Sequence, residues 1–146
     1  MEPLYLVAGQ AEAVVNSLGL TDAYRIDVVT VPIGHCAPPS PPTGTGVYRS
    51  SLSFGPPDEP PLDPGVYVVV ELGDDGTRIQ LTPEMQPLDA LVHLADRLQD
   101  WVIELTHGAA RPRCPGHAHP MRASVVGGSA AWTCPARPDH AIASIG

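Results

Sequence analysis

The chain contains no lysine, a single phenylalanine and only three cysteines among its 146 residues. Its eight basic residues are therefore all arginines, and with 16 acidic residues they give a formal net charge of −8. This acidity argues against a nucleic-acid partner, because phosphate contacts need a basic surface. Apolar runs stay well short of the roughly 18 residues of a membrane helix, and Met1-Glu2-Pro3-Leu4 lacks the basic start of a secretory signal. We therefore expect a cytoplasmic protein with no membrane partner.

Apolar residues make up 43% of the chain, which is enough for a folded core. The charged residues, however, are unevenly distributed along the sequence. Residues 1–106 hold 15 acids and four arginines, a net charge of −11, whereas residues 107–146 hold one acid and four arginines, a net charge of +3. The second stretch also contains four of the six histidines and two of the three cysteines. A shift of this size predicts a separate module. We expect a domain over residues 1–108 and a tail over residues 109–146.

Two helices are predicted in the first part from apolar residues at helical spacing, over 11–18 and over 87–106. Gly19 and Gly108 follow them, and glycine is the usual residue just beyond a helix end. Ala11, Val14, Val15 and Leu18 form the apolar positions of the first helix. The buried stripe of the second, longer helix is predicted to comprise Leu88, Leu91, Leu94, Ala95, Leu98, Val102 and Leu105.

The strands are predicted from β-branched residues and from alternation at a period of two. Residues 24–33 form one such strand, and residues 66–82 form a hairpin around Gly73-Asp74-Asp75-Gly76, with a sheet buried on one face only. The fold class is therefore α+β, in which a small, mostly antiparallel sheet packs on one long helix.

A proline-rich loop is expected over residues 34–64, which contain nine prolines. Either it is a stiff surface loop, the preferred interpretation, or its paired prolines are a ligand for a proline-reading domain. Residues 47–54 inside it could form a further strand. His35-Cys36 at its start offers a thiol that is either a simple unreactive cysteine or one activated by the neighbouring imidazole.

Acidic side chains recur at four-residue spacing in the long predicted helix, at Asp96, Asp100 and Glu104. This spacing places them on one face, where a row of like charges is typical of a solvated surface rather than a metal site. The chain also lacks a phosphate-binding glycine loop, a dinucleotide fingerprint and a serine elbow. We assign no catalytic residue and no organic cofactor.

The tail contains cysteine and histidine residues in a pattern that is typical of metal ligands. Cys114-Pro115-Gly116-His117-Ala118-His119 precedes two predicted strands, residues 121–126 and 130–134, that meet at Gly127-Gly128, and Cys134-Pro135 closes the second strand. Two cysteine-proline pairs thus lie at the outer ends of a hairpin. Over residues 113–140 the tail resembles a zinc ribbon, in which each cysteine-proline turn directs its ligands at one ion. A typical ribbon repeats Cys-x-x-Cys twice, whereas this chain has His117 and Arg137 in place of the second cysteines.

The resemblance implies a zinc ion, which prefers four thiolate and imidazole ligands in a tetrahedron. The preferred set is Cys114, His117, Cys134 and His140, with His119 as the alternative fourth ligand. A zinc ion would replace the core that about forty residues with few large apolar side chains cannot build.

Three other interpretations of the tail remain open. A metal-free hairpin could pack on the first domain through Trp132, or Cys114 and Cys134 could pair as a disulfide. An open site with His117, His119, Cys134 and a water would be that of a small zinc-dependent hydrolase. The preferred function is a non-catalytic accessory protein with a structural zinc site that binds a protein partner, and the hydrolase is the alternative.

Overall fold

Two helices and six strands make up the fold in the computed structural model, which describes residues 2–20, 22–32 and 62–145. The first sheet has the order β1-β2-β3 and the second the order β4-β5-β6, and all neighbouring strands in both are antiparallel. The α+β fold class is therefore confirmed. The predicted strand over 47–54 and Cys36 lie outside the described residues. The helices are α1 (Glu2–Ser17) and α2 (Pro87–Leu105); the strands are β1 (Arg25–Val31), β2 (Gly65–Leu72), β3 (Asp75–Leu81), β4 (Arg122–Val126), β5 (Ser129–Cys134) and β6 (Arg137–Ser144).

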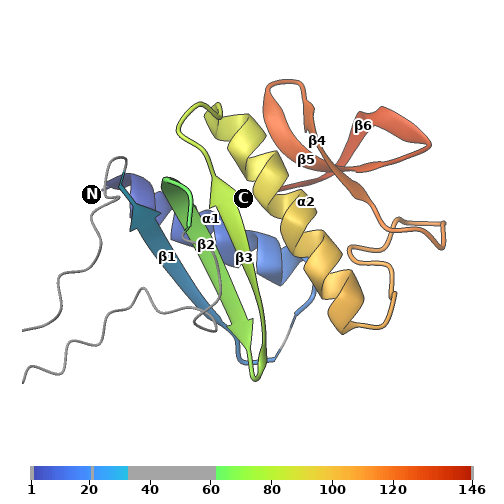
Figure 1. The fold of residues 1–146 in the computed structure, drawn as a ribbon. Coiled ribbons are helices and arrows are strands. Elements are labelled where there is room, and N and C mark those ends of the chain that lie inside the picture. The colour runs from blue at the N-terminus through green and yellow to red at the C-terminus, as the bar shows by residue number, and fades with distance from the viewer. Residues whose placement is uncertain (1, 21, 33–61, 146) are drawn as a thin grey trace, which may run out of the picture.

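Helix α2 lies between the two sheets, and α1 crosses behind the first sheet (Figure 1). The prediction of one long helix is thus incomplete, because α1 begins at Glu2 rather than at residue 11 and has 16 residues against 19 in α2. Its start escaped prediction because residues 2–10 lack a clear apolar period and include Pro3, which the first turn of a helix tolerates. The predicted stop is confirmed, since Gly19 has a φ of 71°.

The apolar face of α1 is buried as expected, with Ala11, Val14, Val15 and Leu18 at most 1% exposed. The stripe of α2 is wider than predicted because the helix packs on a sheet at each side. Gln99 and Trp101, both assigned no core role from the sequence, are buried, whereas Leu88 at the helix start is 36% exposed.

The first sheet confirms the predicted hairpin, in which β2 pairs with β3 around a two-residue turn, Gly73-Asp74. Val68, Val70 and Ile79 face the buried cluster. The expectation that only one face would be buried is wrong, because Tyr67 and Val69 on the other face of the central strand are 5% and 7% exposed.

The second sheet contains the predicted hairpin and a third strand, β6, that sequence patterning missed. All eight residues of β6 are exposed, so its side chains carry no apolar alternation that would mark a strand. Pro138 lacks a backbone N–H and is compatible with β6 because β6 is an edge strand. On the outer side of an edge strand, no hydrogen bond to a neighbouring strand is needed.

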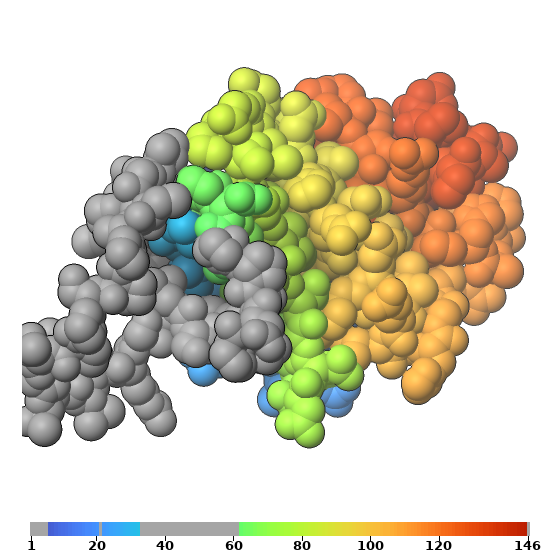
Figure 2. Space-filling view, in the orientation of Figure 1, coloured from blue at the N-terminus to red at the C-terminus, as the bar shows by residue number. Residues whose placement is uncertain are grey.

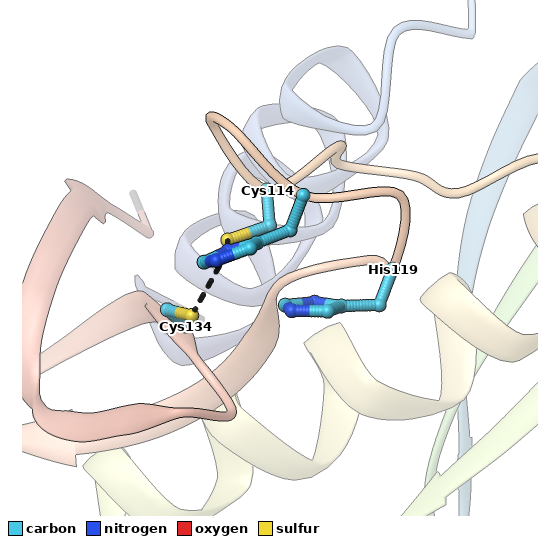
Figure 3. Close-up of side chains that lie close together, drawn as sticks. Cys114, His119 and Cys134 are labelled. Carbon is cyan, nitrogen blue, oxygen red and sulfur yellow. Dashed lines mark hydrogen bonds between the residues drawn. The ribbon is translucent and has the colours of Figure 1, made fainter.

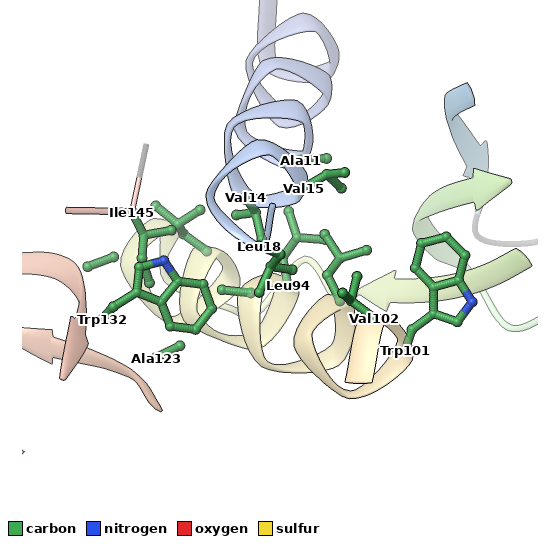
Figure 4. Packing of buried hydrophobic residues seen from close by; sticks show 14 of the residues in the cluster. Ala11, Val14, Val15, Leu18, Leu94, Trp101, Val102, Ala123, Trp132 and Ile145 are labelled. Atoms are coloured by element: carbon green, nitrogen blue, oxygen red, sulfur yellow. The ribbon is translucent and has the colours of Figure 1, made fainter. Parts of the chain in front are cut away.

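One cluster of buried side chains runs through both parts of the chain, from Ala11 and Val14 in α1 to Trp132 and Ile145 in the tail (Figure 4). The division into domains at Gly108 stays a prediction about which residues fold on their own. What the structure adds is that the tail shares its core with α1 and α2.

A hydrogen bond between distant segments accompanies this shared core, because the Trp132 indole Nε1 donates to Ser17 Oγ over 3.2 Å. We expect Ser17→Ala to lower the free energy of unfolding by about 1–2 kcal/mol, since the buried indole N–H loses its acceptor. Urea denaturation measures the effect, with Ser129→Ala at an exposed position of β5 as the matched control. Equal losses in the two variants would contradict a specific role for this hydrogen bond.

Candidate metal site

The loop between α2 and β4 folds back on itself and so brings its donor side chains together. Cys114-Pro115-Gly116-His117 forms a tight turn in which the His117 N–H donates to the Cys114 carbonyl over 3.1 Å. Gly116 has a φ of 75°, which matches the positive φ that a type II turn requires at its third residue, and proline is common at the second. The turn places Cys114 and His117 side by side.

Backbone pairing closes the base of this loop. The Cys114 N–H donates to the His119 carbonyl over 3.1 Å, and the Met121 N–H donates to the Pro112 carbonyl over 2.8 Å. The chain leaving the loop therefore runs beside the chain entering it, which returns His119 to the neighbourhood of Cys114.

The side chain of Gln99 in α2 hydrogen-bonds the backbone at both ends of this loop. Its Nε2 donates to the Arg111 carbonyl over 2.8 Å and to the Met121 carbonyl over 2.6 Å. The Gln99 side chain is buried, so the two bonds satisfy carbonyls to which water has little access. A single amide thus joins the long helix to the start and end of the loop.

The structure brings four potential ligands together: Cys114, His117, His119 and Cys134. Their donor atoms all lie within 4.8 Å of one another. Three come from the loop and Cys134 from the end of β5, and Figure 3 shows the side chains of Cys114, His119 and Cys134 gathered around one point. Both cysteines are free, buried thiols.

Each imidazole is oriented so that one nitrogen is available to a metal. His117 Nδ1 lies 3.3 Å from the Cys114 sulfur and 3.6 Å from the Cys134 sulfur. His119 Nδ1 lies 3.1 Å from the Pro120 carbonyl, so this nitrogen donates and Nε2 is left as the ligand. The two rings stack with centroids 4.7 Å apart.

The two thiols differ in their surroundings. Burial raises the pKa of Cys114, and the neighbouring Cys134 thiol adds to the increase. Burial also opposes ionisation of Cys134, but the backbone N–H of Ala136, the Cys114 thiol, and the backbone and guanidinium of Arg137 together hold its pKa below the ordinary value. Cys134 is thus the better prepared thiolate, and N–H groups that stabilise a thiolate also support a metal-bound sulfur.

No family model, curated protein or solved structure matches the chain. The assignment of this site as a candidate metal centre therefore rests on its geometry. Within the described ranges, no helix combines the length and the apolar character needed to cross a membrane.

His140, the preferred fourth ligand in the sequence prediction, does not belong to the group of four. It lies on the exposed strand β6 and lines a pocket of about 480 Å³ together with Cys114, His117 and Cys134. His119, the alternative, supplies the fourth donor of the group. Residues two apart on an extended segment share a face, and this spacing was the available signal for a His117–His119 pair.

The group also differs from a zinc ribbon in how its ligands are distributed. A ribbon takes two ligands from each of two turns, whereas here Cys114, His117 and His119 come from one loop and Cys134 alone from the other. Arg137, which stands where a second cysteine would be, instead lowers the pKa of the Cys134 thiol. The finding is a possible Cys₂His₂ metal site near the C-terminal strands.

Proposed function

We propose that the protein is a non-catalytic accessory protein whose C-terminal part is held by a structural zinc ion bound to Cys114, His117, His119 and Cys134. The grouping of two buried thiols and two imidazoles within 4.8 Å is the observation that carries this proposal. Two thiolates and two neutral imidazoles are a preferred zinc set.

The observed spacing supports zinc in particular. Tetrahedral zinc, with Zn–S bonds of ~2.3 Å and Zn–N bonds of ~2.0 Å, separates a sulfur from a nitrogen by about 3.5 Å. The separations from His117 Nδ1 to the two sulfurs are 3.3 and 3.6 Å. Only small side-chain movements are needed to close the remaining distances around an ion.

A closed, structural site is favoured over a hydrolytic one by the number and kind of donors. Four protein ligands fill a tetrahedron, and catalytic zinc sites keep one position for water. Two thiolates also neutralise the charge of the ion, which weakens it as a Lewis acid. Among the described residues the group includes no carboxylate that would serve as a base.

The charge distribution along the sequence supports the proposed interaction role. Residues 1–106 carry a formal net charge of −11 and residues 107–146 one of +3, and all basic residues of the tail are arginines. Arginine is suited to fixed, forked contacts with a partner's carboxylates. We place the protein in the cytoplasm, where thiols stay reduced and available to a metal.

The test compares the two histidines that compete for the fourth position. We expect His119→Ala to weaken zinc affinity by about 10-fold or more, because it removes a ligand and opens the tetrahedron. His140→Ala should change it less than about twofold, since His140 lies outside the group. Competition titration with a chromophoric chelator gives the affinities, and cobalt substitution reports on tetrahedral geometry through its visible spectrum.

The two variants are matched, since each removes one imidazole from the tail. A larger loss for His140→Ala would return the assignment to the set predicted from the sequence. A protein purified with no bound metal, and with both thiols freely reactive in the folded state, would contradict the proposed function altogether.

A further inference from the structure

A pocket of about 520 Å³ lies between the C-terminal end of α1 and the loop that follows α2. Ser17, Leu18 and Gly19 line it where the first helix ends, and residues 109–113 and Ala118 line it from the loop. Figure 2 shows this loop, in orange, at the surface of the molecule beside the yellow surface of α2. Two segments that are far apart in the sequence therefore form the pocket together.

Two arginines, Arg111 and Arg113, give this pocket a positive charge. Within the described ranges no acidic residue lines it. The single acid of residues 107–146, Asp139, is not among the lining residues either. The pocket therefore attracts anions, although the chain as a whole carries a net charge of −8.

Both guanidinium groups are free to bind a ligand. In the part of the chain that the structure describes, Arg25 and Arg97 each pair with a nearby aspartate. Arg111 and Arg113, by contrast, form no ion pair and no side-chain hydrogen bond with any described residue. Arg111 is half-buried, and polar groups with reduced access to water usually have a hydrogen-bond partner.

The backbone of both arginines is held in place by other parts of the fold. The Arg111 carbonyl accepts the hydrogen bond from Gln99 Nε2 over 2.8 Å. Arg113 forms an isolated antiparallel β-bridge with Pro120. A site whose backbone is already ordered loses less conformational entropy when a ligand binds.

Gly19 provides the space for the Arg111 side chain at the end of α1. Arg111 Nη1 lies 2.8 Å from the position that a Cβ atom of residue 19 would occupy. Because glycine has no side chain, the guanidinium can lie against the helix end. The carbonyl groups at a helix C-terminus carry partial negative charge and favour a cation there, which keeps the guanidinium at the wall of the pocket.

The chemistry of two guanidinium groups selects the kind of anion. Each guanidinium can donate two parallel N–H bonds to an oxyanion. A carboxylate has two oxygens, which one guanidinium satisfies, whereas a phosphate monoester has three terminal oxygens and a charge of about −1.5 to −2 at pH 7. Among the described lining residues there is no aromatic ring on which a nucleotide base would stack.

We infer that this pocket binds a phosphate monoester group through Arg111 and Arg113. A free phosphorylated molecule and a phosphorylated side chain of a partner protein share this chemistry. The inference goes beyond the proposed function, since none of the four candidate metal ligands lines the pocket. Failure of phosphate binding would leave the zinc titrations standing, and failure of the zinc assignment would leave both arginines at the pocket.

The experiment measures binding to the full-length protein by calorimetry at constant ionic strength. The ligands are O-phosphoserine, a short peptide with a central phosphoserine, the same peptide without phosphate, and succinate as a dicarboxylate. We expect the two phosphorylated ligands to bind at least about 10-fold more tightly than the other two. Tighter binding of the phosphopeptide than of O-phosphoserine identifies a partner protein as the source, and equal binding identifies a small phosphorylated molecule.

Three variants locate the binding. Arg111→Gln and Arg113→Gln each remove one guanidinium, and we expect each to weaken O-phosphoserine binding by about 10-fold or more. Arg122→Gln, at an exposed arginine of β4 outside the pocket, removes the same charge and should change the affinity less than about twofold. Arg113 is exposed, so its variant keeps the site testable if Arg111→Gln does not fold.

Amide chemical shifts show where the phosphate binds. Addition of O-phosphoserine should shift the signals of Gly19, Ala110 and Arg113. Shifts confined to Cys134 and the residues after it would place the phosphate at the metal group and overturn the inference. Absence of binding, equally tight binding of succinate, or full affinity in Arg113→Gln would overturn it as well.

Discussion

Removal of the proposed zinc ion is expected to unfold the second sheet while the first sheet stays folded. The buried side chains that the tail contributes are mostly small, including Ala123, Ala130 and Ala131, and its large ones are few, chiefly Met121, Trp132 and Ile145. Such a segment has little apolar area with which to offset the entropy of its own ordering. Binding of zinc to a site that exists only in the folded state therefore contributes directly to folding.

Hydrogen exchange gives the clearest measurement. With a strong zinc chelator we expect amide protection in β4 and β5 to fall by roughly 100-fold, while β2 and β3 keep theirs. We also expect Cys114→Ser and Cys134→Ser to reproduce this pattern and to lower the Tm by about 10 °C. Cys36→Ser, which removes the third thiol of the chain, is the matched control.

The same measurement also distinguishes the structural zinc site from the metal-free hairpin and from the open hydrolytic site. If the amides of β4 and β5 stay protected after the metal is extracted, zinc is not structural. The hairpin would then be held by its packing through Trp132, which is the metal-free alternative. Loss of a hydrolytic activity on chelation, with protection unchanged, would point to the open site.

Much of the fold could be predicted from the sequence because the spacing of apolar residues indicates the central hairpin and the long helix directly. Residues 66–82 alternate cleanly, and residues 87–106 repeat at helical spacing, so hairpin and helix follow within a residue or two. The same reasoning missed β6, since an exposed edge strand buries nothing and so leaves no apolar alternation. It also started α1 too late, because the helix begins before its apolar stripe does.

The residue types of the candidate site could be predicted from the sequence, but the fourth member of the observed group could not. Cysteine and histidine near two proline turns pointed to a metal, and the sequence placed Cys114, His117 and Cys134 around it. Choosing between His119 and His140 needs the path of the loop, which is fixed by backbone pairing and by Gln99 of α2. The Gln99 contacts leave no local pattern in the sequence, because their partners lie 12 and 22 residues further along the chain.

The role of Gln99 leads to the second large effect, which is expected for Gln99→Met. Methionine keeps the volume of the side chain but removes its N–H donors. The part-buried carbonyl of Arg111 and the buried carbonyl of Met121 then lose their partner. Each unsatisfied carbonyl costs about 1–3 kcal/mol, so the loss of both partners is expected to lower the unfolding free energy by about 2–6 kcal/mol. Urea denaturation of the zinc-loaded protein measures this loss.

The same substitution should act on the metal, because Gln99 holds both ends of the loop that carries Cys114, His117 and His119. We expect zinc affinity to fall by about 10-fold, a typical effect of removing a residue that positions ligands without touching the ion. Gln86→Met is the matched control, since Gln86 is exposed before α2 and its side chain makes no capping hydrogen bond. A loss of stability with unchanged zinc affinity would mean that Gln99 joins helix to loop without positioning the ligands; unchanged stability would contradict both parts of its assigned role.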